Sequence, residues 1–263
     1  MSFLVELKSR NEVLFYFGAA CLGAALVFLV LTRFTAVQVH GVNAWFKPFK
    51  FALSTCLFAW AMAWYCHYLT GFNLQLFNWT VVVLLGFEIA YIALMAGRGD
   101  ISHYNVSSPV RSALFSMMAL AASIVTLYTA YVGLLFFTQS FPELPNYYVW
   151  AIRLSLIIFV VFAFEGFAMG ARLSHSVGAV NDNSNWFIVG WSKTVGDLRV
   201  AHFIGMHALQ VLPVLSFYLL KSTRATILVA LVYALLAVFT LVQALQGKPL
   251  LGTVPVQHEV EDQ

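Results

Sequence analysis

Two glutamates lie inside apolar runs of the sequence, where an ionisable side chain is unusual. Glu88 falls in the middle of one run, and Glu165 falls near the end of another. A carboxylate in a membrane-crossing segment is costly, so it normally faces a polar interior and takes part in proton transfer or ion binding. We therefore take both glutamates as candidates for acid–base chemistry or a proton relay. His207, in a later apolar run, is the third candidate.

Each glutamate is followed by an arginine on the same side of its predicted helix. At about 100° per residue, Glu88 and Arg98 share one stripe, and Glu165 and Arg172 share another. At a rise of about 1.5 Å per residue, Glu88, Glu165 and His207 lie about 9–14 Å from the same end of their helices. We therefore expect a shared polar cavity that opens at that end.

Five cations near this end are candidates for binding an anionic substrate group. They are Lys47, Lys50, Arg98, Arg172 and Arg199. Basic side chains at one membrane face bind carboxylates and phosphates, including lipid headgroups and haem propionates. Cations at helix ends also meet anionic lipid without any special site, so ordinary lipid contact is the competing interpretation.

Four histidines near the same end are candidate metal ligands: His103, His175, His202 and His207. His202 and His207 are five residues apart, about 140° around a helix, so they do not chelate one ion as an i,i+4 pair would. A metal would need one of them together with a loop histidine or Glu165. No two helical histidines lie at matching depth on different helices, which argues against a bis-histidine haem inside the bundle. The cofactor stays open, with metal or haem as the alternatives.

The composition indicates that membrane-spanning helices position these side chains. Of the 263 residues, 61% are hydrophobic and only 10% are charged, whereas soluble domains carry about 25% charged residues. A window of about 20 apolar residues predicts an all-α, seven-helix transmembrane bundle, forming a single domain over 1–250 with a flexible acidic tail over 251–263. The predicted helices are 13–35, 49–70, 77–97, 110–137, 147–171, 199–220 and 224–245.

Residue types at the helix ends support these boundaries. Pro48 is expected just before the second helix, and Ser108 with Pro109 opens the fourth. Gly196–Asp197 is expected to lead into the sixth helix as its cap. Inside that helix, Pro213 predicts a kink and frees the carbonyl of Leu209, because proline has no N–H to donate.

The two ends of the bundle differ in charge and in loop length. We name the end that carries the N-terminus face A and the opposite end face B. Nine of the 14 basic residues fall on face B, so the positive-inside rule predicts an inner (plasma) membrane protein with its N-terminus outside and its C-terminus cytoplasmic. The longer connections, 36–48, 98–109 and 173–197, also lie on face B, and loops often carry function.

Three functions are compatible with this pattern. The first is a membrane-embedded enzyme or redox protein that acts on an anionic or lipid-like substrate. The second is a proton-coupled transporter that uses Glu88 and Glu165. The third is a scaffold or sensor that binds a partner through the 173–197 loop. Membrane lipids and a small-molecule or lipid ligand are the expected partners. Nucleic acid is not expected, because no basic stripe carries exposed aromatics. The sequence does not indicate the oligomeric state.

Overall fold

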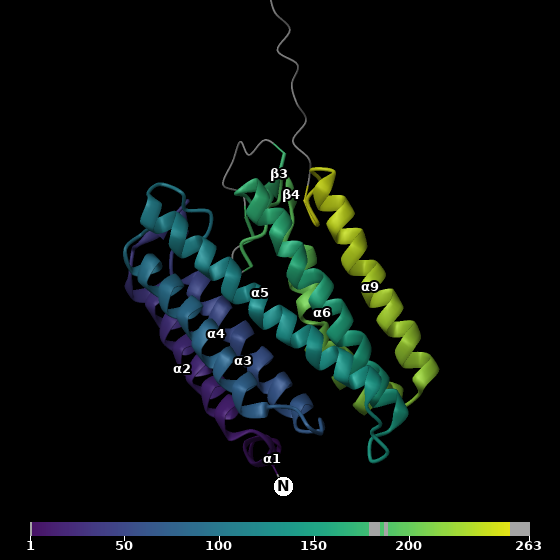
Figure 1. Ribbon diagram of the computed structural model, residues 1–263. Helices are drawn as coiled ribbons and strands as arrows, with labels where there is room; N and C mark the ends of the chain where they lie inside the picture. Colours follow the sequence, from purple (N-terminus) through teal and green to yellow (C-terminus); the bar gives the residue numbers. More distant parts are fainter. Residues whose placement is uncertain (1, 179–184, 187–188, 253–263) are drawn as a thin grey trace, which may run out of the picture.

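A computed structural model describes residues 2–178, 185–186 and 189–252, and the chain forms a bundle of long helices (Figure 1). The predicted acidic tail lies, except for residues 251–252, outside the described residues. The helices are α1 (Phe3–Arg10), α2 (Glu12–Phe34), α3 (Phe46–Cys66), α4 (Leu74–Gly97), α5 (Pro109–Thr138), α6 (Asn146–Arg172), α7 (Arg199–Met206), α8 (Ala208–Leu215), the π-helix η1 (Ser216–Leu220) and α9 (Thr223–Leu245). Two short hairpins, β1 (Gln38–Val39) with β2 (Val42–Asn43) and β3 (Ser176–Val177) with β4 (Gly196–Asp197), complete the described structure.

The all-α prediction is confirmed. Six described helices, α2, α3, α4, α5, α6 and α9, are each long and apolar enough to cross a membrane. The predicted sixth helix is a bent pair, α7 followed by α8 and η1, which makes a seventh span only if the pair is counted as one. The architecture is therefore consistent with a multi-pass membrane protein.

Helix ends follow the sequence with one local difference. The Ser108 side chain accepts a hydrogen bond from the backbone N–H of Arg111 at 3.3 Å, and Pro109 occupies the first helical position as predicted. α3 begins at Phe46, so Pro48 lies inside its first turn rather than before it. Proline is tolerated there because the first backbone N–H groups of a helix have no partner within the helix.

The break in the sixth predicted helix does not lie at Pro213. The two pieces meet at an angle of 43° at His207, between Met206 and Ala208, whereas Pro213 lies inside α8. The second part of the prediction is confirmed, because the hydroxyl of Tyr65 on α3 donates to the carbonyl of Leu209. A side chain from a neighbouring helix thus satisfies a carbonyl that cannot be paired within α8.

The helices pack as two groups with α5 between them. α2, α3 and α4 pack together on one side, and α6 to α9 pack together on the other, while α5 contacts α4 and α6 (Figure 1). A large apolar core joins the groups, with the buried side chains of Phe77, Phe136 and Leu156 among its members. Both hairpins lie at face B, one in the connection between α2 and α3 and the other in the connection between α6 and α7. Each helix group therefore contributes one hairpin to this face.

The β3–β4 hairpin lies directly on the end of α9. A Cβ atom on Gly196 would lie 2.0 Å from the backbone carbonyl oxygen of Ala244, so only glycine allows this approach. Gly196 precedes Asp197, which is 2% exposed. The contact with α9 therefore helps to set the position of a buried carboxylate.

Candidate functional site

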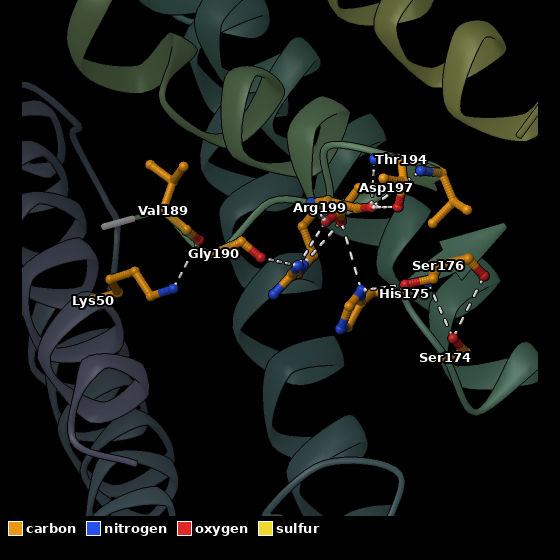
Figure 2. Close-up of polar contacts among 11 residues, drawn as sticks. Lys50, Ser174, His175, Ser176, Val189, Gly190, Thr194, Asp197 and Arg199 are labelled. Atoms are coloured by element: carbon orange, nitrogen blue, oxygen red, sulfur yellow. Dashed lines mark hydrogen bonds and ion pairs between the residues drawn. The ribbon is translucent and has the colours of Figure 1, made fainter. Parts of the chain in front are cut away.

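The centre of the polar cluster at face B is the ion pair between Asp197 and Arg199 (Figure 2). The guanidinium of Arg199 donates from Nε to Oδ1 at 2.9 Å and from a terminal nitrogen to Oδ2 at 2.6 Å. The backbone N–H groups of Ser192 and Arg199 also donate to the carboxylate, at 3.0 and 3.1 Å. Four donors thus satisfy a buried charge, as burial requires.

These donors decide the charge of Asp197. Burial alone would raise the pKa of Asp197, but the hydrogen bonds and positive charge of Arg199 outweigh it, so the pKa lies below its ordinary value. Asp197 is therefore ionised at neutral pH. The ring Nδ1 of His175 lies 3.7 Å from Oδ1 of the same carboxylate. Burial and the charge of Arg199 lower the pKa of His175, so His175 is neutral.

Arg199 and Lys50 both hold the loop between α6 and α7. Arg199 donates to the carbonyl of Gly190, and the Nζ of Lys50 donates to the carbonyl of Val189 at 2.9 Å. Figure 2 shows Lys50 reaching towards this loop from α3, on the opposite side from Asp197 and His175. The bond of Lys50 joins the α2–α4 group to the α6–α9 group at face B.

Lys47 adds a third cation to this cluster. Lys47 and Lys50 lie one turn apart at the start of α3, and both are close enough to Arg199 for their charges to interact. Lys47 also lies over the ring of Phe51, with Nζ 5.8 Å from the centroid. In the part of the chain that the structure describes, neither lysine forms an ion pair with a carboxylate. The cluster therefore carries positive charge that its described residues do not pair.

The loop between α4 and α5 contributes His103 and Tyr104. His103 packs against Phe51, with ring centroids 5.3 Å apart, and its Nδ1 lies 3.2 Å from the hydroxyl oxygen of Ser102. Burial and the nearby charges of Lys47 and His202 lower the pKa of His103 well below its ordinary value. Burial raises the pKa of Tyr104 to about 12. Both side chains are neutral at physiological pH.

Glu165 on α6 pairs with His202 on α7. Their side chains are 6% and 29% exposed, and Nδ1 of His202 lies 3.4 Å from a carboxylate oxygen of Glu165. Nδ1 also lies 2.7 Å from the carbonyl oxygen of Phe162, which can only accept, so Nδ1 donates to it. Neither carboxylate oxygen of Glu165 has a hydrogen-bond partner among the described residues. The pair thus places a carboxylate without a hydrogen-bond donor among the described residues beside an imidazole ring.

The structure brings together only part of the set that the sequence singled out. Lys47, Lys50, Arg199, Glu165, His103, His175 and His202 belong to the cluster. Glu88 is 8% exposed on α4, and the described residues form no ion pair or hydrogen bond with its Oε1. Arg98 and Arg172 are exposed at the ends of α4 and α6. Among the described residues, no hydrogen bond or ion pair links these three to the cluster.

His207 occupies a different position from the one expected for a ligand. It lies at the bend between α7 and α8, packs against Phe203 with centroids 4.3 Å apart, and places Nδ1 3.3 Å from Oε1 of Gln210. Among the described residues, no three His, Cys, Asp or Glu side chains are arranged to hold a metal ion. The predicted metal set of His103, His175, His202 and His207 therefore receives no support.

Asp197 was not identified from the sequence as the partner of Arg199 in the site. The prediction that Gly196–Asp197 caps the sixth helix is wrong, because both residues lie in β4 and the residue that caps α7 is Leu198. The carboxylate of Asp197 instead accepts from the backbone N–H of Arg199 within the ion pair. The Asp197–Arg199 spacing of two residues is the signal that could have revealed the ion pair, because both side chains can then meet within one loop. Tyr104 was missed because its loop carries several polar residues of similar type.

Comparisons of this chain with protein-family models, with curated proteins and with solved structures found no significant match. The residues of the site and their geometry are therefore the basis on which a function is inferred.

Proposed function

We propose that this multi-pass protein crosses the membrane seven times and is a membrane-embedded enzyme that acts on a molecule with a carboxylate or phosphate group. Lys47 and Lys50 bind the anionic group, and Arg199 supports it from the opposite helix group. Glu165 and His202 then accept or return a proton at a neighbouring atom of the substrate. The substrate is membrane-soluble, because the site lies between spanning helices.

One observation carries this proposal: three cations meet at face B, and among the described residues only Asp197 pairs with any of them, through Arg199. Desolvated cations without a counter-ion are costly, so a cluster of this kind is stabilised when an anion binds. The start of α3 adds to the attraction, because backbone N–H groups and the helix dipole favour negative charge at a helix N-terminus. An anion beside Lys47 would interact with the cations and with the N-terminus of α3.

The chemistry follows from the states of the neighbouring groups. A general base must present a free acceptor within hydrogen-bond reach of the proton that it removes. The carboxylate of Glu165 meets this requirement, because neither of its oxygens has a hydrogen-bond partner among the described residues, whereas Asp197 is committed to four donors. The neutral His103 and Tyr104 supply hydrogen bonds without adding charge. The site therefore suits proton transfer beside a bound anion.

The test is native mass spectrometry of detergent-purified protein, with extraction and identification of small anionic molecules that co-purify. Wild-type protein should retain a carboxylate or phosphate compound. The amount that Lys47→Met retains should be lower by about tenfold or more. Lys248→Met is the matched control, because Lys248 is an exposed lysine on the same face. Equal retention in Lys47→Met and Lys248→Met would exclude the site.

A second variant separates binding from chemistry. Glu165→Gln removes the proton acceptor but keeps the size of the side chain, so the ligand should stay bound while its conversion stops. A Glu165→Gln protein that converts the ligand at the wild-type rate would leave the anion site in place but contradict the role of Glu165.

Proton-coupled transport is the second candidate, and the bend in the sixth span favours it. Bent or broken spanning helices often surround transported substrates, and Glu88 is a buried carboxylate with an unpaired oxygen. Proton uptake into proteoliposomes would distinguish the two candidates. A transporter would lose uptake in Glu88→Gln, whereas the proposed enzyme would keep its activity in that variant.

A further inference from the structure

A groove between α4 and α5 lies outside the site described above. Its volume is about 440 Å³. Apolar side chains form its length, and polar groups gather where it reaches face B. The lining residues used below are Tyr91, Leu94, Arg98, Val110 and Arg111. None of them belongs to the cluster around Asp197.

The apolar part of the groove is open to the surroundings of the bundle. Leu94 is 50% exposed and Val110 is 69% exposed. Both belong to helices long and apolar enough to cross a membrane, so these side chains face lipid. The groove is therefore accessible to an acyl chain from the bilayer.

The polar end holds a hydrogen-bond donor without a partner. Tyr91 is 6% exposed, it lines the groove, and its hydroxyl has no hydrogen-bond partner among the described residues. A buried hydroxyl without a partner is costly. A ligand oxygen at this position would remove that cost.

The same end carries surplus positive charge. Arg111 forms an ion pair with Asp100 at 2.6 Å. Arg98 forms no ion pair within the described part of the chain, and it lies at the exposed end of α4. One guanidinium therefore remains for an anionic group, at the end of a helix long and apolar enough to cross a membrane.

We propose that this groove is a binding site for a phospholipid with an anionic headgroup. One acyl chain lies along the apolar wall between Leu94 and Val110. The guanidinium of Arg98 pairs with the phosphate, and the hydroxyl of Tyr91 donates to a phosphate or ester oxygen. The preference for an anionic headgroup comes from Arg98, and the affinity for a lipid comes from the groove.

The experiment measures phosphatidylglycerol and phosphatidylcholine with identical acyl chains bound to the purified full-length protein by native mass spectrometry. Wild-type protein should prefer phosphatidylglycerol. Arg98→Gln should reduce this preference by about tenfold, whereas Tyr91→Phe should reduce the binding of both lipids several-fold, because both carry the phosphate and ester oxygens. Arg33→Gln is the matched control, because Arg33 is an exposed arginine at the face B end of α2 outside the groove.

A third variant tests the groove itself. Leu94→Trp places a large side chain where the acyl chain is proposed to lie, and because Leu94 is half exposed the change should leave the melting temperature unaltered. The variant should lose bound phosphatidylglycerol although every charge is kept. The proposal is overturned if Leu94→Trp binds as wild type, if Arg98→Gln and Arg33→Gln behave alike, or if both lipids bind equally to wild-type protein.

Discussion

The hydroxyl of Tyr65 on α3 donates a hydrogen bond to the carbonyl oxygen of Leu209 on α8. Leu209 lies four residues before Pro213, so no backbone N–H is available for this carbonyl within the helix. We expect Tyr65→Phe to lower the free energy of unfolding by about 0.5–2 kcal/mol, because it leaves a buried acceptor unpaired. Thermal unfolding in detergent measures the change.

Pro213→Ala supplies the control for this prediction. Alanine restores an N–H that can pair with Leu209, so Tyr65→Phe should cost less in the Pro213→Ala background than in the wild type. The double-mutant cycle measures this difference. An equal cost in both backgrounds would show that the proline is unrelated to the role of Tyr65.

Gly205→Ala should destabilise the contact between α6 and α7. A Cβ atom at position 205 would lie 2.1 Å from the ring carbon Cγ of Phe162, so the two helices would have to separate. Overpacking of this kind costs about 1–3 kcal/mol. Gly23→Ala is the control, because no atom lies within 4 Å of its added Cβ. Equal melting temperatures for the two variants would refute the close packing of Gly205.

Asp197→Asn should be among the most destabilising polar substitutions in the chain. It leaves the buried end of Arg199 without its counter-ion, and breaking a buried ion pair costs about 3–5 kcal/mol. Asp100→Asn breaks the more exposed pair with Arg111, where Asp100 is 25% and Arg111 42% exposed, and should cost about 1 kcal/mol or less. Melting curves of both variants give the comparison, and a reversed order would contradict this interpretation.

The stability of the protein should fall as the pH is lowered from 7 to 5. Burial lowers the pKa of His103, so in this range the unfolded chain binds a proton that the folded chain does not. Stability then rises with pH, by at most about 1.4 kcal/mol per unit for one histidine. The increase in the free energy of unfolding is complete above the ordinary histidine pKa of about 6.5.

His103→Phe should reduce this dependence and keep the contact with Phe51. The same substitution at His67, an exposed histidine at face A, is the control. Melting temperatures of the three proteins across this pH range are the measurement. A slope that is unchanged in His103→Phe would assign the effect to another group.

The helices were predictable because apolar length is a property of the sequence itself. The predicted spans end within a few residues of those observed, and Ser108 marks the start of α5 as expected. The π-helix and the bend at His207 were not predictable, because both depend on packing against other helices. The short hairpins at face B were missed because two residues per strand give no periodic pattern.

The sequence allowed a prediction of the depth of the site residues but not of the direction in which each side chain points. The rise per residue fixes how far Glu88 and Glu165 lie from face B, and both predictions rested on it. The rotation of each helix about its own axis depends on neighbouring side chains, so the sequence did not show that Glu165 meets His202 while Glu88 remains apart. Arg199 joins the cluster because Asp197 holds it there.

The close approach of Gly196 to Ala244 links the site to the thickness of the bilayer. Among the described residues, no side chain of α9 forms a hydrogen bond or ion pair with the cluster, yet the end of α9 supports the strand that carries Asp197. Most of α9 faces lipid, and a helix of this kind changes its tilt when the hydrocarbon layer becomes thinner or thicker. A change in that tilt moves Ala244 and therefore the Asp197–Arg199 pair. We therefore expect the position of this ion pair to depend on the acyl-chain length of the surrounding lipids.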